Sequence, residues 1–156
     1  MDERMPETFR IEEIAYDRDT CLPLLLQGDE QENMIDRYIG RSRLYAMYEN
    51  GRMICICAVT DEGEGVCEIK NLATQAGFRR RGCGTAMIRF VEEHYRKSHR
   101  ILRVGTGETP STMGFYGRCG FVFSHRLFGF FTENYAVPII EEGVRLRDMV
   151  YLKKEL

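Results

Sequence analysis

The stretch LATQAGFRRRGCGTA, residues 72–86, is the part of the sequence best suited to chemistry. Three arginines, Arg79, Arg80 and Arg81, precede Gly82 and Gly84 where a β-rich run gives way to a helical pattern. Glycines at such a junction let backbone N–H groups approach a ligand, and the first turn of the helix presents unpaired donors and the positive end of its dipole. Arginine adds a planar fork that donates two hydrogen bonds to phosphate oxygens. The stretch therefore predicts a phosphate-binding turn, which also includes Cys83 and the hydroxyl of Thr85.

A plainer interpretation of this turn stays open. Gly-x-Gly before a helix is a weak signal by itself, and the same residues could form a tight turn beside a solvated basic patch. The dinucleotide-binding and P-loop patterns are excluded, because no third glycine follows at the required spacing and no Gly-Lys-Ser/Thr occurs.

The elements that must position the turn follow from the apolar periodicity. Asn50-Gly51 separates two β-rich runs, as a type I′ hairpin requires. β-rich segments occur at 9–15, 43–49, 53–61, 66–74, 101–106, 121–125 and within 145–152, and helical ones at 19–39 (two helices broken near Gly28), 83–98 and 111–119. This order predicts an α/β fold: a mixed, mostly antiparallel sheet of about six to seven strands, with a parallel βαβ crossover and about four flanking helices.

Composition restricts the class of protein. The 156 residues fit one domain spanning 1–156, and the net charge of −2, from 22 basic and 24 acidic residues, does not favour a nucleic-acid binder. The charged start, MDERMPETFRIEE, is unlike a secretory signal, and no apolar run is long enough to cross a membrane, so we expect a cytoplasmic protein without a membrane partner. The six cysteines are expected to be reduced and buried, and no metal is expected, since no nearby ligands complete a site around Cys55 and Cys57.

Two spaced motifs resemble a known family. Arg79-x-x-Gly82-x-Gly84, preceded by NLAT, is similar to the acetyl-CoA signature of GNAT superfamily N-acetyltransferases, and FYGRCGF (115–121) resembles the family's later Phe/Leu-Tyr-x-x-x-Gly-Phe segment. The resemblance implies the acyl-CoA N-acyltransferase fold, acetyl-CoA as co-substrate, and backbone amides that hold its pyrophosphate. It also implies two catalytic candidates, Tyr116 and Glu68.

Tyr116 occupies the position where the family keeps a tyrosine near the CoA sulfur, so it is expected to donate a proton or hydrogen bond to the departing thiolate. The alternative is a core tyrosine beside Phe115 and Phe121. Glu68 is the candidate base that deprotonates the amine, directly or through water. The alternative for Glu68 is a salt bridge with Lys70, since Glu68, Lys70 and Leu72 are expected to alternate on one face of a strand.

Further cofactor contacts are implied around these two residues. Leu72 and Thr74, with Ala73 between them, are expected to offer backbone groups to the pantetheine arm, and the Leu72 N–H to the acetyl carbonyl. Thr109 replaces an asparagine common in the family, and Ser111 is either a cofactor contact or an N-cap.

The acceptor site is expected to be built by the early helices and by the aromatic segment 127–143, which is predicted to be irregular. Phe128, Phe130, Phe131 and Tyr135 are too many aromatics to remain in water, so some should fold over the sheet. Four acids are candidates for anchoring a cationic amine, with solvated surface acids as the alternative: Glu133, Glu141, Glu142 and Asp148.

These observations predict acetyl transfer from acetyl-CoA to a primary amine on a small molecule, by direct attack in a ternary complex. A protein or peptide N-acetyltransferase and a non-catalytic CoA-binding sensor are the alternatives. The family resemblance also leaves a homodimer open, without a residue-level argument, and the acceptor is not identified.

Overall fold

A computed structural model describes residues 9–16, 18–29 and 31–156. Its first half is antiparallel: β1 (Phe9–Ile14) pairs with β2 (Ser42–Glu49), β2 with β3 (Arg52–Gly63), and β3 with β4 (Val66–Thr74). The β2–β3 turn has positive φ at both Asn50 (51°) and Gly51 (78°), which is the backbone that a type I′ hairpin needs. The predicted hairpin is therefore confirmed.

The second half contains the parallel crossover. The helix α3 (Cys83–Tyr95) connects β4 to the parallel strand β5 (Ile101–Gly107). There follow α4 (Pro110–Arg118), β6 (Val122–Leu127), α5 (Phe130–Asn134), β7 (Ile140–Glu141), β8 (Val144–Arg145) and β9 (Met149–Glu155). The sheet order is β1-β2-β3-β4-β5-β9-β6, with β9 inserted between β5 and β6. The predicted mixed, mostly antiparallel α/β sheet is confirmed.

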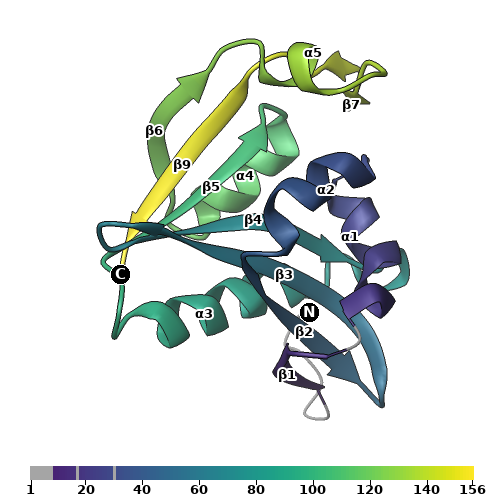
Figure 1. Ribbon diagram of the computed structural model, residues 1–156, viewed down its shortest axis with the longest axis vertical. Helices are drawn as coiled ribbons and strands as arrows, with labels where there is room; N and C mark the ends of the chain where they lie inside the picture. Colours follow the sequence, from purple (N-terminus) through teal and green to yellow (C-terminus); the bar gives the residue numbers. More distant parts are fainter. Residues whose placement is uncertain (1–8, 17, 30) are drawn as a thin grey trace.

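Helices cover both faces of this sheet. One core cluster packs α3 and α4 against the face that carries Cys57, Val59, Cys67 and Ile69. A second cluster packs α1 (Leu22–Gly28) and α2 (Glu32–Ile39) against the face that carries Ile56 and Ala58. Figure 1 shows α1 and α2 together on one side and α3 on the other.

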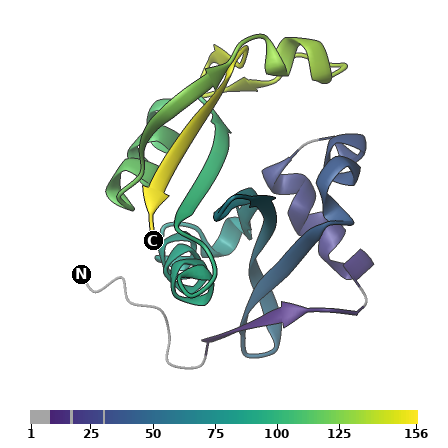
Figure 2. The same cartoon turned by 60° about the vertical axis from the view of Figure 1, so that its left-hand side comes forward.

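The sheet does not stay closed between its two halves. β4 and β5 pair only over Val66–Ile69 and Ile101–Val104. Beyond these residues the two strands separate, and the arm formed by β5, β9 and β6 diverges from β4 in both views (Figures 1 and 2). This separation creates the site described below.

A β-bulge in β4 changes which residues share a face. Val59 is opposite Ile69, whereas Ala58 is opposite Asn71, so Lys70 is an extra residue without a partner on β3. Before the bulge, Ile69 points to the α3 face and Glu68 to the α1–α2 face; after it, Leu72 packs with the α3–α4 cluster. The expectation that Glu68, Lys70 and Leu72 lie on one face was wrong, because a bulge reverses the alternation.

Segment 127–143 is more regular than expected. It contains the short helix α5, which begins after Gly129 in a left-handed conformation (φ 68°), and the β7–β8 hairpin, whose turn has positive φ at Glu142 and Gly143. The described residues therefore form five α-helices rather than about four, with two short 3₁₀ turns at Arg18–Cys21 and Ala76–Phe78. All six cysteines are free thiols, and only Cys119 is partly exposed. Within the described ranges no helix is both long and apolar enough to span a membrane.

Candidate active site

The gap between β4 and β5 exposes backbone hydrogen-bonding groups. The N–H of Gln75 donates to the carbonyl of Ile54 at 2.8 Å, which fixes these two opposed residues as a hydrogen-bonded pair. Along an antiparallel ladder, hydrogen-bonded pairs alternate with pairs that are not hydrogen-bonded to each other. Thr74 faces Cys55 and Leu72 faces Cys57 in pairs of the second kind, so both direct their backbone N–H and C=O groups away from β3. β5 has already separated at this level. The N–H groups of Leu72 and Thr74 therefore face the gap.

The start of α3 is the tight glycine turn for which anion binding was predicted. Gly82 is the N-cap with φ 83°, and Arg80 also has positive φ (61°), so the chain doubles back tightly before the helix. The first helical hydrogen bond runs from the N–H of Ala86 to the carbonyl of Gly82 at 2.9 Å. The N–H groups of Gly84 and Thr85 precede it and have no partner within the helix.

Gly84 is required by close packing. A Cβ at this position would lie 3.0 Å from Cζ of Phe115 on α4, so a larger residue would press on that ring. Because no side chain covers them, the amides at this turn can approach a ligand directly.

A cleft of about 1000 Å³ joins the turn to the gap. Most of the predicted cofactor residues line it: Leu72, Thr74, Arg79, Arg80, Gly82, Cys83, Gly84, Thr85 and Ser111. Thr112, Phe115 and Arg118 on α4 also line it and were not predicted. The sequence contains little indication of these three contacts, because the only motif on α4 is FYGRCGF (115–121).

Three predicted cofactor residues do not line this cleft. Ala73 is buried in the cluster beneath α1. The guanidinium of Arg81 pairs with Glu49 at 3.2 Å and lies over the Phe78 ring. Thr109 is the N-cap of α4: its hydroxyl oxygen accepts a hydrogen bond from the N–H of Thr112 at 3.3 Å. Thr109 is therefore the N-cap of α4. The interpretation of Ser111 as the N-cap was wrong.

Tyr116 reaches the cleft from the core. Its side chain lies on α4 beside the rings of Phe115 and Phe121, and it is only 7% exposed, yet it lines the cleft. Its hydroxyl makes no hydrogen bond with any described residue. Burial raises the pKa of Tyr116, and nearby cysteines act in the same direction, so this tyrosine stays protonated at neutral and mildly alkaline pH. The ring of Tyr116 can therefore pack in the core while its hydroxyl stays available to donate a hydrogen bond into the cleft.

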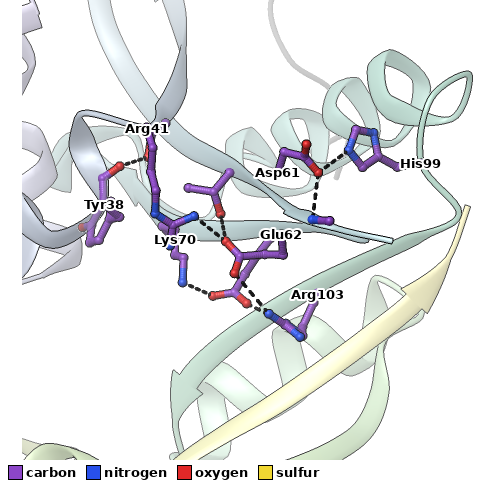
Figure 3. A network of polar contacts seen from close by, with 11 residues as sticks. Tyr38, Arg41, Asp61, Glu62, Lys70, His99 and Arg103 are labelled. Atoms are coloured by element: carbon purple, nitrogen blue, oxygen red, sulfur yellow. Dashed lines mark hydrogen bonds and ion pairs between the residues drawn. The ribbon is translucent and has the colours of Figure 1, made fainter. Parts of the chain in front are cut away.

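Glu68 lies on the other face of the sheet, in a buried ionic network. Its side chain is 3% exposed, and its two oxygens pair with Lys70 Nζ and Arg103 Nε, each at 2.6 Å. Arg103 also lies 3.5 Å from Glu62, which pairs with Arg41 at 2.7 Å (Figure 3). The salt bridge with Lys70 is therefore present. Glu68 lines a second cavity, described below, rather than the cofactor cleft.

The far end of the cleft lies between α1 and segment 129–136. Its walls are mainly apolar and aromatic, with two carboxylates: Asp29, Phe131, Tyr135, Ile139, Glu141, Leu146 and Met149. Phe131 and Tyr135 fold over the sheet as expected, whereas Phe128 remains 75% exposed. Asp29 was not predicted, because a single aspartate after a helix carries no signal in the sequence.

Hydrogen bonds fasten segment 129–136 to the α1–α2 region. The hydroxyl of Tyr135 donates to Asp29 Oδ1 at 2.6 Å, and Arg37 Nη1 donates to Asn134 Oδ1 at 2.9 Å. The N–H of Ala136 donates to Gln31 Oε1 at 3.1 Å. We refer to these three contacts as the loop clasp. They connect the two walls of the cleft at this end.

The four candidate anionic anchors have different placements. Only Glu141 lines the cleft. Asp148 Oδ1 accepts a hydrogen bond from the N–H of Gly129 at 2.8 Å, and Glu142 accepts one from Ser111 at the start of α4. Hydrogen bonds from Thr109 and Ser111 lower the pKa of Glu142. Asp148 and Glu142 therefore support the loops, and Glu133 lies beside Gly129 outside the cleft.

The cleft fits an acyl-CoA ligand by its own features. The turn at Gly82–Thr85 offers uncovered amides and nearby arginines for a pyrophosphate, and the gap offers strand amides for an extended pantetheine arm. Tyr116 lines the same cleft.

This combination of a split mixed sheet and a glycine turn defines an acyl-CoA N-acyltransferase fold. The acetyltransferase (GNAT) family model matches residues 7–121, and the chain belongs to this family. The expectation of an acetyl-CoA-dependent N-acetyltransferase is thereby confirmed.

Individual relatives cover almost the whole chain. The N-acetyltransferase YvbK of Bacillus subtilis strain 168, itself uncharacterized, is 26% identical over 152 residues, which are 96% of this chain and 98% of the relative. A GNAT family acetyltransferase from Elizabethkingia anophelis, solved with acetyl-CoA bound, is 27% identical with a TM-score of 0.90, covering 97% of this chain and 100% of its own. The IAA acetyltransferase from Bacillus cereus ATCC 14579 is 30% identical with a TM-score of 0.86, covering 95% and 99%.

Proposed function

We propose that this protein transfers an acetyl group from acetyl-CoA to a primary amine on a small molecule, by direct attack within a ternary complex. The observation that carries the proposal is the continuous cleft from the Gly82–Thr85 turn, past the gap between β4 and β5, to the acceptor end under the loop clasp. The acetyl-CoA bound to the similar protein from Elizabethkingia anophelis supports the identity of the donor.

Acetyl-CoA, when bound, supplies the acetyl group as a thioester with a thiolate leaving group. The amides of Arg81–Thr85 hold the pyrophosphate, and Arg79 and Arg80 contribute positive charge from the cleft wall. The N–H of Leu72 is the donor to the acetyl carbonyl oxygen, whose negative charge grows as the amine attacks. A donor fixed by the strand needs little reorganisation.

Tyr116 is the donor to the sulfur. Its hydroxyl has no competing hydrogen bond with any described residue, and its raised pKa keeps the proton in place. Glu68 is the candidate base. Because both of its oxygens are engaged by cations and it lies across the sheet from Leu72, it would take the amine proton through a water molecule.

A small-molecule acceptor is favoured by the closed acceptor end. The loop clasp joins segment 129–136 to Asp29, Gln31 and Arg37, and a protein acceptor would favour an open groove instead. The single-domain organisation over residues 1–156, a cytoplasmic location and a homodimer remain predictions.

The test is release of free CoA thiol from acetyl-CoA, measured with a panel of small primary amines and a panel of peptides. We expect release that depends on a small amine, with the acetylated amine identified by mass. Release only with peptides would replace the proposal by a peptide N-acetyltransferase. CoA binding without release in either panel would favour the sensor module.

A further inference from the structure

A second cavity of about 150 Å³ opens on the α1–α2 face of the sheet, next to the acceptor end of the cleft. The two cavities have a common wall, since the same residues line both: Asp29, Ile69, Lys70, Gly105, Tyr135 and Met149. A ligand at the acceptor end could therefore extend a substituent into the second cavity. The volume is sufficient for a small substituent of a few non-hydrogen atoms.

The charged groups around this cavity leave an excess of positive charge. Three cations line it, Arg37, Arg41 and Lys70, against two carboxylates, Asp29 and Glu68. Behind the wall, Arg103 and Glu62 add one charge of each sign (Figure 3). The net charge of the surroundings is therefore +1.

Lys70 is only partly compensated by its ion-pair partner. Its side chain is 19% exposed, and its ammonium group pairs with Glu68, but the single charge of Glu68 is shared with Arg103. A partly buried cation with only part of an opposing charge is stabilised by a further anion nearby. Lys70 is also the bulge residue of β4, which places it on the wall of both cavities.

Asp29 is already counted in this balance, and hydrogen bonds hold its carboxylate on the wall that the two cavities share. Its carboxylate accepts hydrogen bonds from Tyr135, Tyr38 and the N–H of Gln31, with Arg37 nearby. Most of the remaining lining is aromatic, aliphatic or thioether, with Gly105 between: Met34, Tyr38, Ile69, Phe130, Tyr135, Met149 and Tyr151. A small anionic group on an apolar stem suits this combination.

We propose that the acceptor carries a carboxylate in addition to its amine, and that this carboxylate binds in the second cavity against Lys70 and Arg41. The acceptor class is thus an amino acid or another amino carboxylate, rather than a polyamine or a neutral amine. A monoanion matches the excess of one positive charge. This inference rests on the proposed function for the position of the amine.

The test compares matched pairs of acceptors: β-alanine, 4-aminobutyrate, 6-aminohexanoate and α-amino acids, each against its carboxamide. In the wild-type enzyme we expect kcat/KM for the better carboxylates to exceed that of their carboxamides by roughly tenfold or more, as for a partly buried charge pair. In Lys70→Met the ratio should fall toward one. Lys70 also forms an ion pair with Glu68, so Lys70→Met can change turnover of the carboxylate and of its carboxamide alike. The ratio of the two kcat/KM values removes this common effect and reports the contribution of the acceptor's carboxylate.

Two further variants separate the charge from its surroundings. Arg41→Met should also reduce the ratio, although Arg41 pairs with Glu62 and not with Glu68. Arg96→Met, which removes a surface cation paired with Glu93 on α3, should leave the ratio unchanged. A wild-type ratio near one, or a high ratio that persists in both Lys70→Met and Arg41→Met, would overturn the inference.

Direct binding distinguishes this inference from the proposed function. Calorimetric titration of the CoA-bound protein with 6-aminohexanoate, 4-aminobutyrate and their carboxamides needs no turnover. Tighter binding of a carboxylate, lost in Lys70→Met, would support the subsite even if no acetyl transfer were found. Equal binding of carboxylate and carboxamide, with amines still acetylated, would reject the subsite and leave the proposed function in place.

Discussion

The hydroxyl of Tyr135 donates a 2.6 Å hydrogen bond to the carboxylate of Asp29, although the two residues are 106 positions apart. Burial raises the pKa of both side chains, and the hydrogen bond opposes this rise at Asp29. The contact is the most direct part of the loop clasp and lies on the wall of the cofactor cleft. It therefore connects the helix pair of the first half to the loop of the second half at the acceptor end.

Removing this contact should weaken acceptor binding specifically. In Tyr135→Phe we expect the acceptor KM to rise several-fold, because the clasp loses its shortest hydrogen bond, worth about 1–3 kcal/mol when one partner is charged. The affinity for acetyl-CoA should be unchanged. Steady-state kinetics with each substrate varied would measure this, with Tyr16→Phe, at an 86% exposed position, as the matched control. Equal effects on both substrates would show that the contact only supports the fold.

Tyr116 should matter more for turnover than for binding. Tyr116→Phe retains the ring that packs against Phe115 and Phe121 but loses the proton donor. We expect kcat to fall roughly tenfold to a thousandfold, the range for one positioned donor, with little change in acetyl-CoA affinity. Since the pKa of Tyr116 is raised, the wild-type rate should not decline through its ionisation below about pH 10. A stable variant with wild-type turnover would reduce Tyr116 to a packing residue.

The role of Glu68 can be read from the pH profile. If Glu68 removes the amine proton, Glu68→Gln should lower kcat/KM most near neutral pH and less at high pH, where free amine is abundant. If Glu68 only pairs with Lys70 and Arg103, the pH profile of Glu68→Gln should stay parallel to that of the wild type. In that case Lys70→Met should cause a similar loss of activity. Rates across pH 6 to 10 with a good acceptor separate these outcomes.

Buried thiols predict a loss of stability in alkali. Burial raises the pKa of Cys55 and of Cys67 to about 12. The unfolded chain releases these protons first, near pH 8.5, so the stability is complete below that pH and falls as the pH rises above it. At pH 10 the Cys55 thiol should lower the free energy of unfolding by roughly 1–2 kcal/mol, and Cys67 should act in the same direction.

Urea unfolding at pH 7 and pH 10 measures this effect. The free energy of unfolding should decrease less between pH 7 and pH 10 in Cys55→Ala than in the wild type. This holds even though Cys55→Ala is less stable at pH 7, because it loses core packing. An unfolding free energy that does not change from pH 7 to pH 10 would contradict the thiol assignment.

The local parts of the site could be predicted from the sequence. The turn at Gly82 needs positive φ, a conformation that glycine adopts readily. The same holds for the Asn50-Gly51 hairpin. Such features depend on a few neighbouring residues, so the sequence pattern was sufficient to predict them.

The features that failed depend on residues distant in sequence. The bulge at Lys70 is a matter of register between β4 and β3, and it moved Glu68 to the face opposite Leu72. The importance of Asp29 arises only from its contact with Tyr135. One local choice also stayed open: Ser111 was predicted as either a cofactor contact or an N-cap, and the cap of α4 is Thr109, because both residue types make good caps and only the backbone decides between them.

Calorimetric titration with acetyl-CoA of the wild type, Gly84→Val and Gly117→Val tests the central claim, that the cofactor binds on the amides at the start of α3. Gly117 lies on α4 with open space around its Cβ position, so Gly117→Val controls for a bulky residue in a helix. We expect acetyl-CoA binding to be abolished in a folded Gly84→Val, retained in Gly117→Val, and weakened by added salt in the wild type. Unchanged acetyl-CoA affinity in a correctly folded Gly84→Val protein would contradict it.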